Sequence, residues 1–112
     1  MRFILLGILI VGLAACGGRA SPPAGVQFAS GPISRACIDA DRRAATTQLC
    51  QCVQAVANDT LSSREQARAA RFFADPQQAQ DTRQSDNVAL ERFWTRYRAF
   101  ADRAETICRA VT

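Results

Sequence analysis

The chain has 112 residues, a net charge of +4 and an apolar fraction of 48%, values that fit one small folded domain. Histidine is absent and all 14 basic residues are arginine. These absences exclude histidine-based metal sites and catalytic triads, and they also exclude P-loop and Schiff-base lysines. The modest positive charge does not favour nucleic acid as a partner.

The first sixteen residues have the pattern of an export signal. One arginine precedes the apolar run 3–11, and Leu13-Ala14-Ala15-Cys16 follows this run. A helix that spans a membrane needs about 20 apolar residues, so this shorter run is better interpreted as a cleaved signal. The segment 13–16 resembles the lipobox of bacterial lipoproteins at every position. The alternative is an ordinary secretory signal with an incidental cysteine.

The lipobox resemblance implies a signal peptide at 1–15 and a lipidated mature N-terminus at Cys16, which anchors the protein to a membrane. Gly17 is not the Asp that retains lipoproteins in the inner membrane under the best-known sorting rule, so outer-membrane attachment facing the periplasm is expected. Residues 16–30 are rich in glycine, proline and serine and predict a flexible linker. Val26 and Phe28 are its only large apolar side chains, and the sequence leaves open whether they pack on the body or on membrane.

Residues 31–112 predict a helical domain. Ser30-Gly31-Pro32 is typical of a helix start, because proline is tolerated in the first turn. A turn at 42–46 precedes a second helix at 47–57, which Asn58-Asp59-Thr60 is expected to end. Ser62 and Glu65 have the spacing of a capping box and predict a third helix through Ala74.

Two more helices are expected after Asp75-Pro76. The first is short and covers 76–83. The second is the longest, covers 87–109, and has Ser85-Asp86 as its expected N-cap. The sequence therefore predicts an all-α fold, a small disulfide-stapled bundle of four to five short helices behind the signal peptide and linker.

The longest helix has a wide apolar stripe at helical spacing. Aromatic side chains in such a stripe are far more often core than ligand cage, so Phe93 and Trp94 are expected in the core. Tyr97 is expected at the rim, where its hydroxyl can reach water. The stripe consists of Leu90, Phe93, Trp94, Tyr97, Phe100, Ala104 and Ile107.

Four cysteines remain once Cys16 is assigned to lipid, and in an exported protein they predict two disulfides. Cys50 and Cys52 point about 200° apart on a helix, so one pairs with Cys37 and the other with Cys108. We favour Cys37–Cys50 with Cys52–Cys108, because Cys52 shares the inward face of the second helix. The swapped pairing stays open at this point. A zinc site is less favoured, because structural zinc sites usually separate two cysteines by two to four residues and only one residue separates Cys50 from Cys52. A Cys-x-Cys redox pair is also less favoured.

Arginines form a line on each of two helices. Arg64, Arg68 and Arg71 share one face of the third helix, and Arg92, Arg96 and Arg103 lie similarly on the longest. Such lines form either a solvated face, which is the commoner case, or a surface for anionic headgroups or an acidic partner. We take Arg92, Arg96 and Tyr97 as the candidate partner surface.

The body resembles a group of uncharacterised, disulfide-bearing helical lipoproteins of Gram-negative bacteria, some of which are labelled arginine transporters. Besides the lipobox, the resemblance is carried by GPISRAC at 31–37, LCQCVQAVA at 49–57 and FWTRY at 93–97. The resemblance implies the fold rather than transport, because one cleaved signal makes no membrane pathway.

The sequence contains no recognisable catalytic constellation, and no metal or cofactor is expected. The first hypothesis is a non-enzymatic, periplasm-facing lipoprotein that binds another protein as an adaptor or envelope-maintenance module. The alternatives are an inhibitor or immunity-type protein for a periplasmic enzyme, and an accessory binder in arginine transport.

Overall fold

The computed structural model describes residues 25–43 and 45–111, so Cys16 and the expected signal peptide lie outside the described residues. Every regular element in this described part is helical, which confirms the predicted all-α class. The elements are α1 (Pro32–Asp39), α2 (Thr47–Thr60), α3 (Ser63–Ala74), α4 (Pro76–Arg83), α5 (Val88–Cys108) and the 3₁₀ turn η1 (Arg109–Val111).

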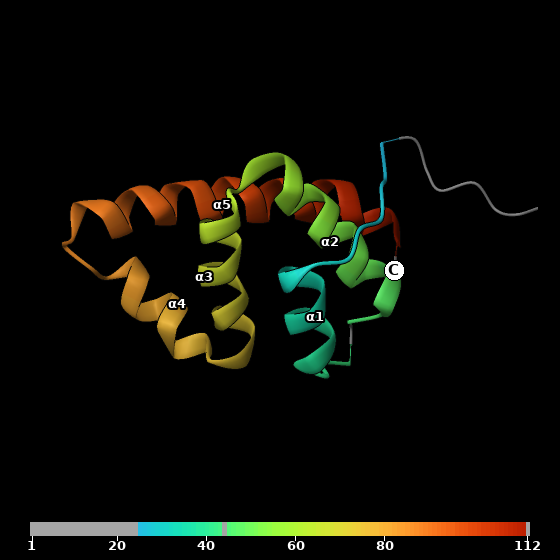
Figure 1. Cartoon of the computed structure of the whole chain (residues 1–112), viewed down its shortest axis with the longest axis horizontal. Helices are drawn as coiled ribbons and strands as arrows, with labels where there is room; N and C mark the ends of the chain where they lie inside the picture. The colour runs from blue at the N-terminus through green and yellow to red at the C-terminus, as the bar shows by residue number, and fades with distance from the viewer. Residues whose placement is uncertain (1–24, 44, 112) are drawn as a thin grey trace, which may run out of the picture.

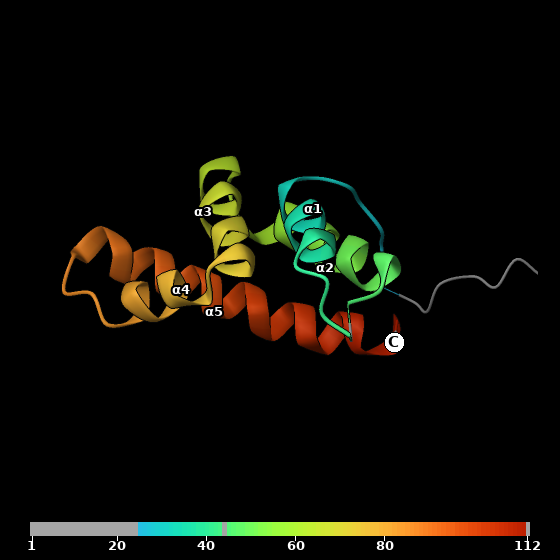
Figure 2. The same cartoon turned by 90° about the horizontal axis from the view of Figure 1, so that it is seen from below.

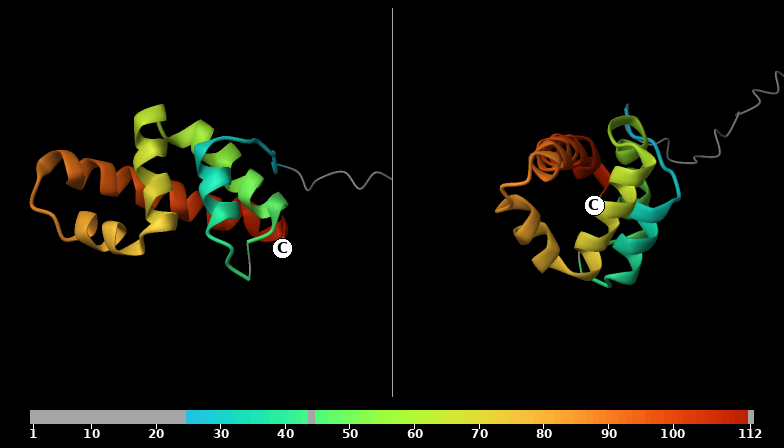
Figure 3. Two further views of the ribbon diagram at one scale, coloured as in Figure 1. Left: turned by 60° about the horizontal axis from the view of Figure 1, so that its bottom comes forward. Right: turned by 60° about the vertical axis from the view of Figure 1, so that its left-hand side comes forward.

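The long helix α5 is the platform on which the others are arranged. Figure 1 shows α1 and α3 side by side, both running across the direction of α5, and α1 contacts both α2 and α3. The view from below in Figure 2 places α1, α2 and α3 on one side of α5, and α4 lies along its N-terminal half. The end-on view in Figure 3 shows that α3 and α4 lead the chain around to the start of α5.

The core lies where α2 and α3 pack on α5. Phe93 and Phe100 are buried, as predicted, and Trp94 and Tyr97 are partly buried against them. Phe72 of α3 contacts this aromatic cluster edge-on, with its ring centroid 5.0 Å from that of Tyr97. The buried members of the core are Val26, Ile33, Cys52, Val56, Ala57, Leu61, Ala69, Phe72, Phe93, Phe100, Ala104 and Cys108.

The packed part of the chain reaches back beyond Gly31, into the segment expected as a linker. Val26 is buried in the core, and the backbone N–H of Ala29 donates to the carbonyl of Gln51 at 3.0 Å. Phe28 remains exposed. Of the two apolar side chains in the expected linker, Val26 therefore belongs to the folded body.

Two disulfides join α2 to its neighbours, in the pairing that the sequence favoured. Cys50 bonds to Cys37 of α1, and Cys52 bonds to Cys108 at the end of α5. All four cysteines are buried. Because Cys50 and Cys52 point in different directions from a single turn of α2, this turn is covalently joined both to α1 and to the C-terminal end of α5.

Two predicted helix boundaries were wrong, the C-terminal end of the second helix and the N-cap of the longest helix. The second helix continues through Thr60 instead of ending at Ala57, because the side chain of Asn58 is held by Gln54 and Gln66 and does not compete with the backbone. The longest helix is capped by Asn87, not by Ser85 or Asp86. The Asn87 side-chain oxygen accepts from the backbone N–H groups of the next turn, so the helix begins at Val88.

Candidate functional site

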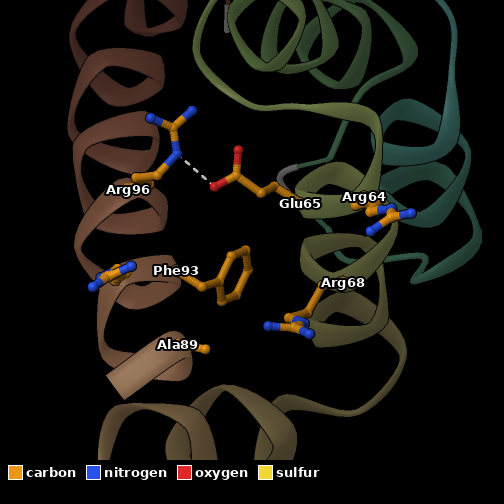
Figure 4. Close-up of a pocket in the computed structure, with 7 residues that line it drawn as sticks. Arg64, Glu65, Arg68, Ala89, Phe93 and Arg96 are labelled. Carbon is orange, nitrogen blue, oxygen red and sulfur yellow. Dashed lines mark hydrogen bonds and ion pairs between the residues drawn. The ribbon is translucent and has the colours of Figure 1, made fainter. Parts of the chain in front are cut away.

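Two members of each arginine line border one hollow between α3 and α5. The hollow has a volume of about 220 Å³. Figure 4 shows that α3 and α5 supply its opposite sides and that the Phe93 ring lies between them. We call this hollow the arginine groove; its lining residues are Arg64, Glu65, Arg68, Ala89, Arg92, Phe93 and Arg96.

Local sequence places these side chains. On α3, Ser62 and Glu65 form the predicted capping box: the Ser62 hydroxyl accepts from the Glu65 N–H, and the Glu65 carboxylate accepts from the Ser62 N–H. Arg64 and Arg68 follow at i, i+4 spacing and therefore share one face of α3. Arg92 and Arg96 have the same spacing on α5.

One ion pair joins the two walls of the arginine groove. The Arg96 Nε–H donates to Glu65 Oε2 at 2.5 Å, and Arg96 Nη2 donates to the carbonyl of Thr60 at 2.9 Å. The hydrogen bond from Arg96 lowers the pKa of the Glu65 carboxyl, against a smaller opposing effect of burial. The same hydrogen bond raises the pKa of Arg96. The carboxylate of the groove is thus already neutralised by one of its four arginines.

The other three arginines leave the groove positively charged. Arg68 lies over the Phe93 ring, with its guanidinium carbon 5.2 Å from the ring centroid. Arg64 and Arg92 make no ion pair with any residue in the described part of the chain. Guanidinium groups bind carboxylate and phosphate oxygens in a bidentate manner, so the groove is suited to an anion.

The structure divides the predicted partner surface between two sides of α5. Arg92 and Arg96 line the arginine groove, but Tyr97 lines a different hollow of about 190 Å³, together with Arg42 of the α1–α2 loop. We call it the Tyr97 hollow; it is lined by Arg42, Phe72, Phe73, Pro76, Ala79 and Tyr97. Arg71 and Arg103, the outer members of the two lines, do not line the arginine groove.

A third hollow, almost wholly apolar, follows the C-terminal half of α5. Its volume is about 320 Å³, and α1, α2 and α3 supply the facing walls. We call it the apolar trough; it is lined by Cys37, Leu49, Val53, Phe73, Ala104, Glu105, Cys108 and Arg109. Phe73 lines both this trough and the Tyr97 hollow, so the two hollows are neighbours along α5.

Sequence reasoning found the arginine lines but not that they meet, and it did not identify the apolar trough. The approach of Arg64 and Arg68 to Arg92 depends on how α3 crosses α5, which no local pattern encodes. Within residues 25–43 and 45–111, no group of three or more histidine, cysteine or acidic residues is arranged to hold a metal. No helix in the same part of the chain has the length and apolar character needed to cross a membrane.

The arrangement of these hollows is the basis for assigning a function, because similarity to known proteins contributes nothing here. No family model, no curated protein and no solved structure matches the chain.

Proposed function

We propose that this protein is a non-enzymatic binding module of the bacterial envelope, anchored by lipid at Cys16 and facing the periplasm, whose arginine groove holds an acidic partner protein. The observation that carries the proposal is the meeting of two arginine lines around Phe93, with Glu65 as the only carboxylate in the lining. The lipid anchor is supported by the lipobox residues and by their resemblance to bacterial lipoproteins.

The charge distribution favours an acidic segment over a single small anion. Arg64 and Arg68 line the groove from α3, and Arg92 lines it from α5. A peptide with two or more carboxylates that lies across the groove would meet a guanidinium group at each rim. Such contacts fix orientation and increase the rate of association, and they weaken as salt is added.

The hollows give less support to binding of free arginine. A guanidinium ligand requires carboxylates, and each of the hollows described above is lined by no more than one. In the arginine groove that carboxylate is already paired with Arg96. The lining residues therefore support a protein-binding role better than a role as an accessory binder in arginine transport.

The proposal is tested by crosslinking in intact envelopes, followed by identification of captured proteins. The double variant Arg64→Ala/Arg92→Ala removes two of the three charges that have no ion pair in the described part of the chain, and it leaves the Arg96–Glu65 pair and the Arg68–Phe93 contact in place. We expect it to lose an acidic protein that wild type captures at low salt. The matched control Arg71→Ala/Arg98→Ala removes the same charge from the same two helices outside the groove and should retain that protein. Equal capture by both double variants would contradict the proposal.

The anchor is tested separately by metabolic labelling with palmitate. We expect wild type to be labelled and Cys16→Ser to remain as an unlabelled precursor. Labelling of Cys16→Ser at the wild-type level would contradict lipidation at Cys16, whatever the result of the crosslinking.

A further inference from the structure

The apolar trough and the Tyr97 hollow share the lining residue Phe73, and each is lined by residues of α5 or its C-terminal end. Leu49 and Val53 of α2 and Ala104 of α5 form much of the trough wall, and they leave its surface nearly free of polar atoms. The volume of about 320 Å³ lies within the usual size of a small-molecule site.

The two hollows differ in charge. In the apolar trough, Glu105 and Arg109 form an ion pair at 3.3 Å. In the Tyr97 hollow, Arg42 has no carboxylate within ion-pair distance in the described part of the chain. The Tyr97 hollow therefore has one uncompensated positive charge, and it lies beside Tyr97.

Tyr97 adds a hydrogen-bond donor next to that charge. Its side chain is half-buried among Phe72, Phe93, Trp94 and Phe100, and its hydroxyl makes no hydrogen bond with the described residues. Burial raises the pKa of the Tyr97 hydroxyl, and the nearby charge of Arg42 partly opposes that effect. The hydroxyl thus stays protonated at neutral pH and can donate to an anion that also contacts Arg42.

We infer that the trough and the Tyr97 hollow together bind a free fatty acid, with the acyl chain in the trough and the carboxylate between Arg42 and the Tyr97 hydroxyl. Tyr97 and Cys108 are about 16 Å apart along the helix axis at the standard rise, comparable with an extended laurate chain. The chain would pass beside Phe73, the wall common to both hollows. This site is separate from the arginine groove and does not depend on the proposed function.

The test uses the protein purified from its host and held in phosphatidylcholine nanodiscs, with a diazirine analogue of laurate as the probe. We expect crosslinks in the peptides of α2, α3 and α5 that carry Leu49, Phe73 and Ala104. Laurate should compete with the probe at least about tenfold better than its methyl ester, because only the acid forms a charged hydrogen bond with Tyr97 and Arg42.

Substitutions at the carboxylate end distinguish a site from simple partitioning into the bilayer. Arg42→Ala and Tyr97→Phe should each weaken competition by laurate about tenfold, and neither removes a core contact. The neighbouring Arg43→Ala is the matched control and should behave as wild type. Crosslinks outside the trough, or equal competition by laurate and its ester, would overturn the inference even if a variant failed to fold.

Discussion

The buried side chain of Gln54 joins three helices through hydrogen bonds. Its Oε1 accepts from the backbone N–H groups of Ile33 and Ser34 at 2.7 and 3.0 Å, which satisfies the start of α1. Its Nε2 donates to Asn58 and to Gln66 of α3. Gly31 packs so closely that a Cβ there would lie 2.7 Å from the Gln54 amide carbon. A polar residue is thus required at a position with 1% exposure.

Gln54→Leu should therefore destabilise the protein by about 2–4 kcal/mol, since two buried N–H groups lose their acceptor. Denaturant titration of the variant and wild type gives the difference in unfolding free energy. Gln48→Leu places the same side chain on the exposed face of α2 and should change stability by less than about 0.5 kcal/mol. A similar small effect at both positions would show that the Gln54 network contributes little.

Glu65 gives α3–α5 packing a dependence on pH. Because Arg96 lowers the pKa of this carboxyl in the folded state, its stabilising contribution is complete above the ordinary value of 4.5 and is lost as pH falls through the lowered value. Glu65→Gln keeps a side-chain cap for Ser62 but removes the charge. We expect wild type to exceed this variant in urea midpoint at pH 7, with the difference shrinking below pH 4.5. A difference that is independent of pH would contradict the ion pair.

The aromatic side chains of α5 contact Phe72 of α3 beside the arginine groove. Phe93 is 4% exposed and contacts Phe72 edge-on, whereas Trp94 is only partly buried. Loss of the Phe72–Phe93 contact would remove packing between the two helices that form the walls of the arginine groove. The groove therefore depends on the core beneath it.

Phe93→Ala should cost about 3–5 kcal/mol, close to the whole stability of a domain this small. Trp94→Ala should cost less, because part of its surface is already in water. Denaturant titration of both variants beside wild type measures the two losses. If Trp94→Ala lowers the free energy of unfolding more than Phe93→Ala does, Trp94 contributes more to the core than Phe93, contrary to this prediction.

Sequence patterns predicted helices well where the signal was local. The Ser62–Glu65 box, Pro32 and Pro76 each act within one turn, and each marks a helix start in the structure. Asn58 was misinterpreted because one of its two hydrogen-bond partners, Gln66, belongs to another helix. The arginine groove was not predicted for the same reason, since its two sides meet only through tertiary packing.

At the scale of the whole molecule, the two disulfides constrain very different lengths of chain. Cys37 and Cys50 are separated by 13 positions, and Cys52 and Cys108 by 56. The longer loop removes more entropy from the unfolded chain. It also fixes the end of α5 on α2, beside the apolar trough.

Replacing Cys52 and Cys108 together by alanine should therefore destabilise the protein by about 1 kcal/mol more than replacing Cys37 and Cys50 together. Thermal unfolding of the two double variants under non-reducing conditions gives the comparison. Equal losses would indicate that the unfolded chain is already compact around the longer loop.

Cys50 and Cys52 bond to different neighbours of α2, and this affects the order in which the two disulfides can form. In the oxidising compartment, α1 and α2 can pair and oxidise Cys37 with Cys50 before α5 has packed on them, because this bond closes a short loop. Cys52 then remains a free thiol until it reaches Cys108, which follows it by 56 positions. A chain truncated within α5 lacks Cys108 and would therefore keep Cys52 as a free thiol. This thiol distinguishes a truncated chain from a complete one, in which all four of these cysteines are paired.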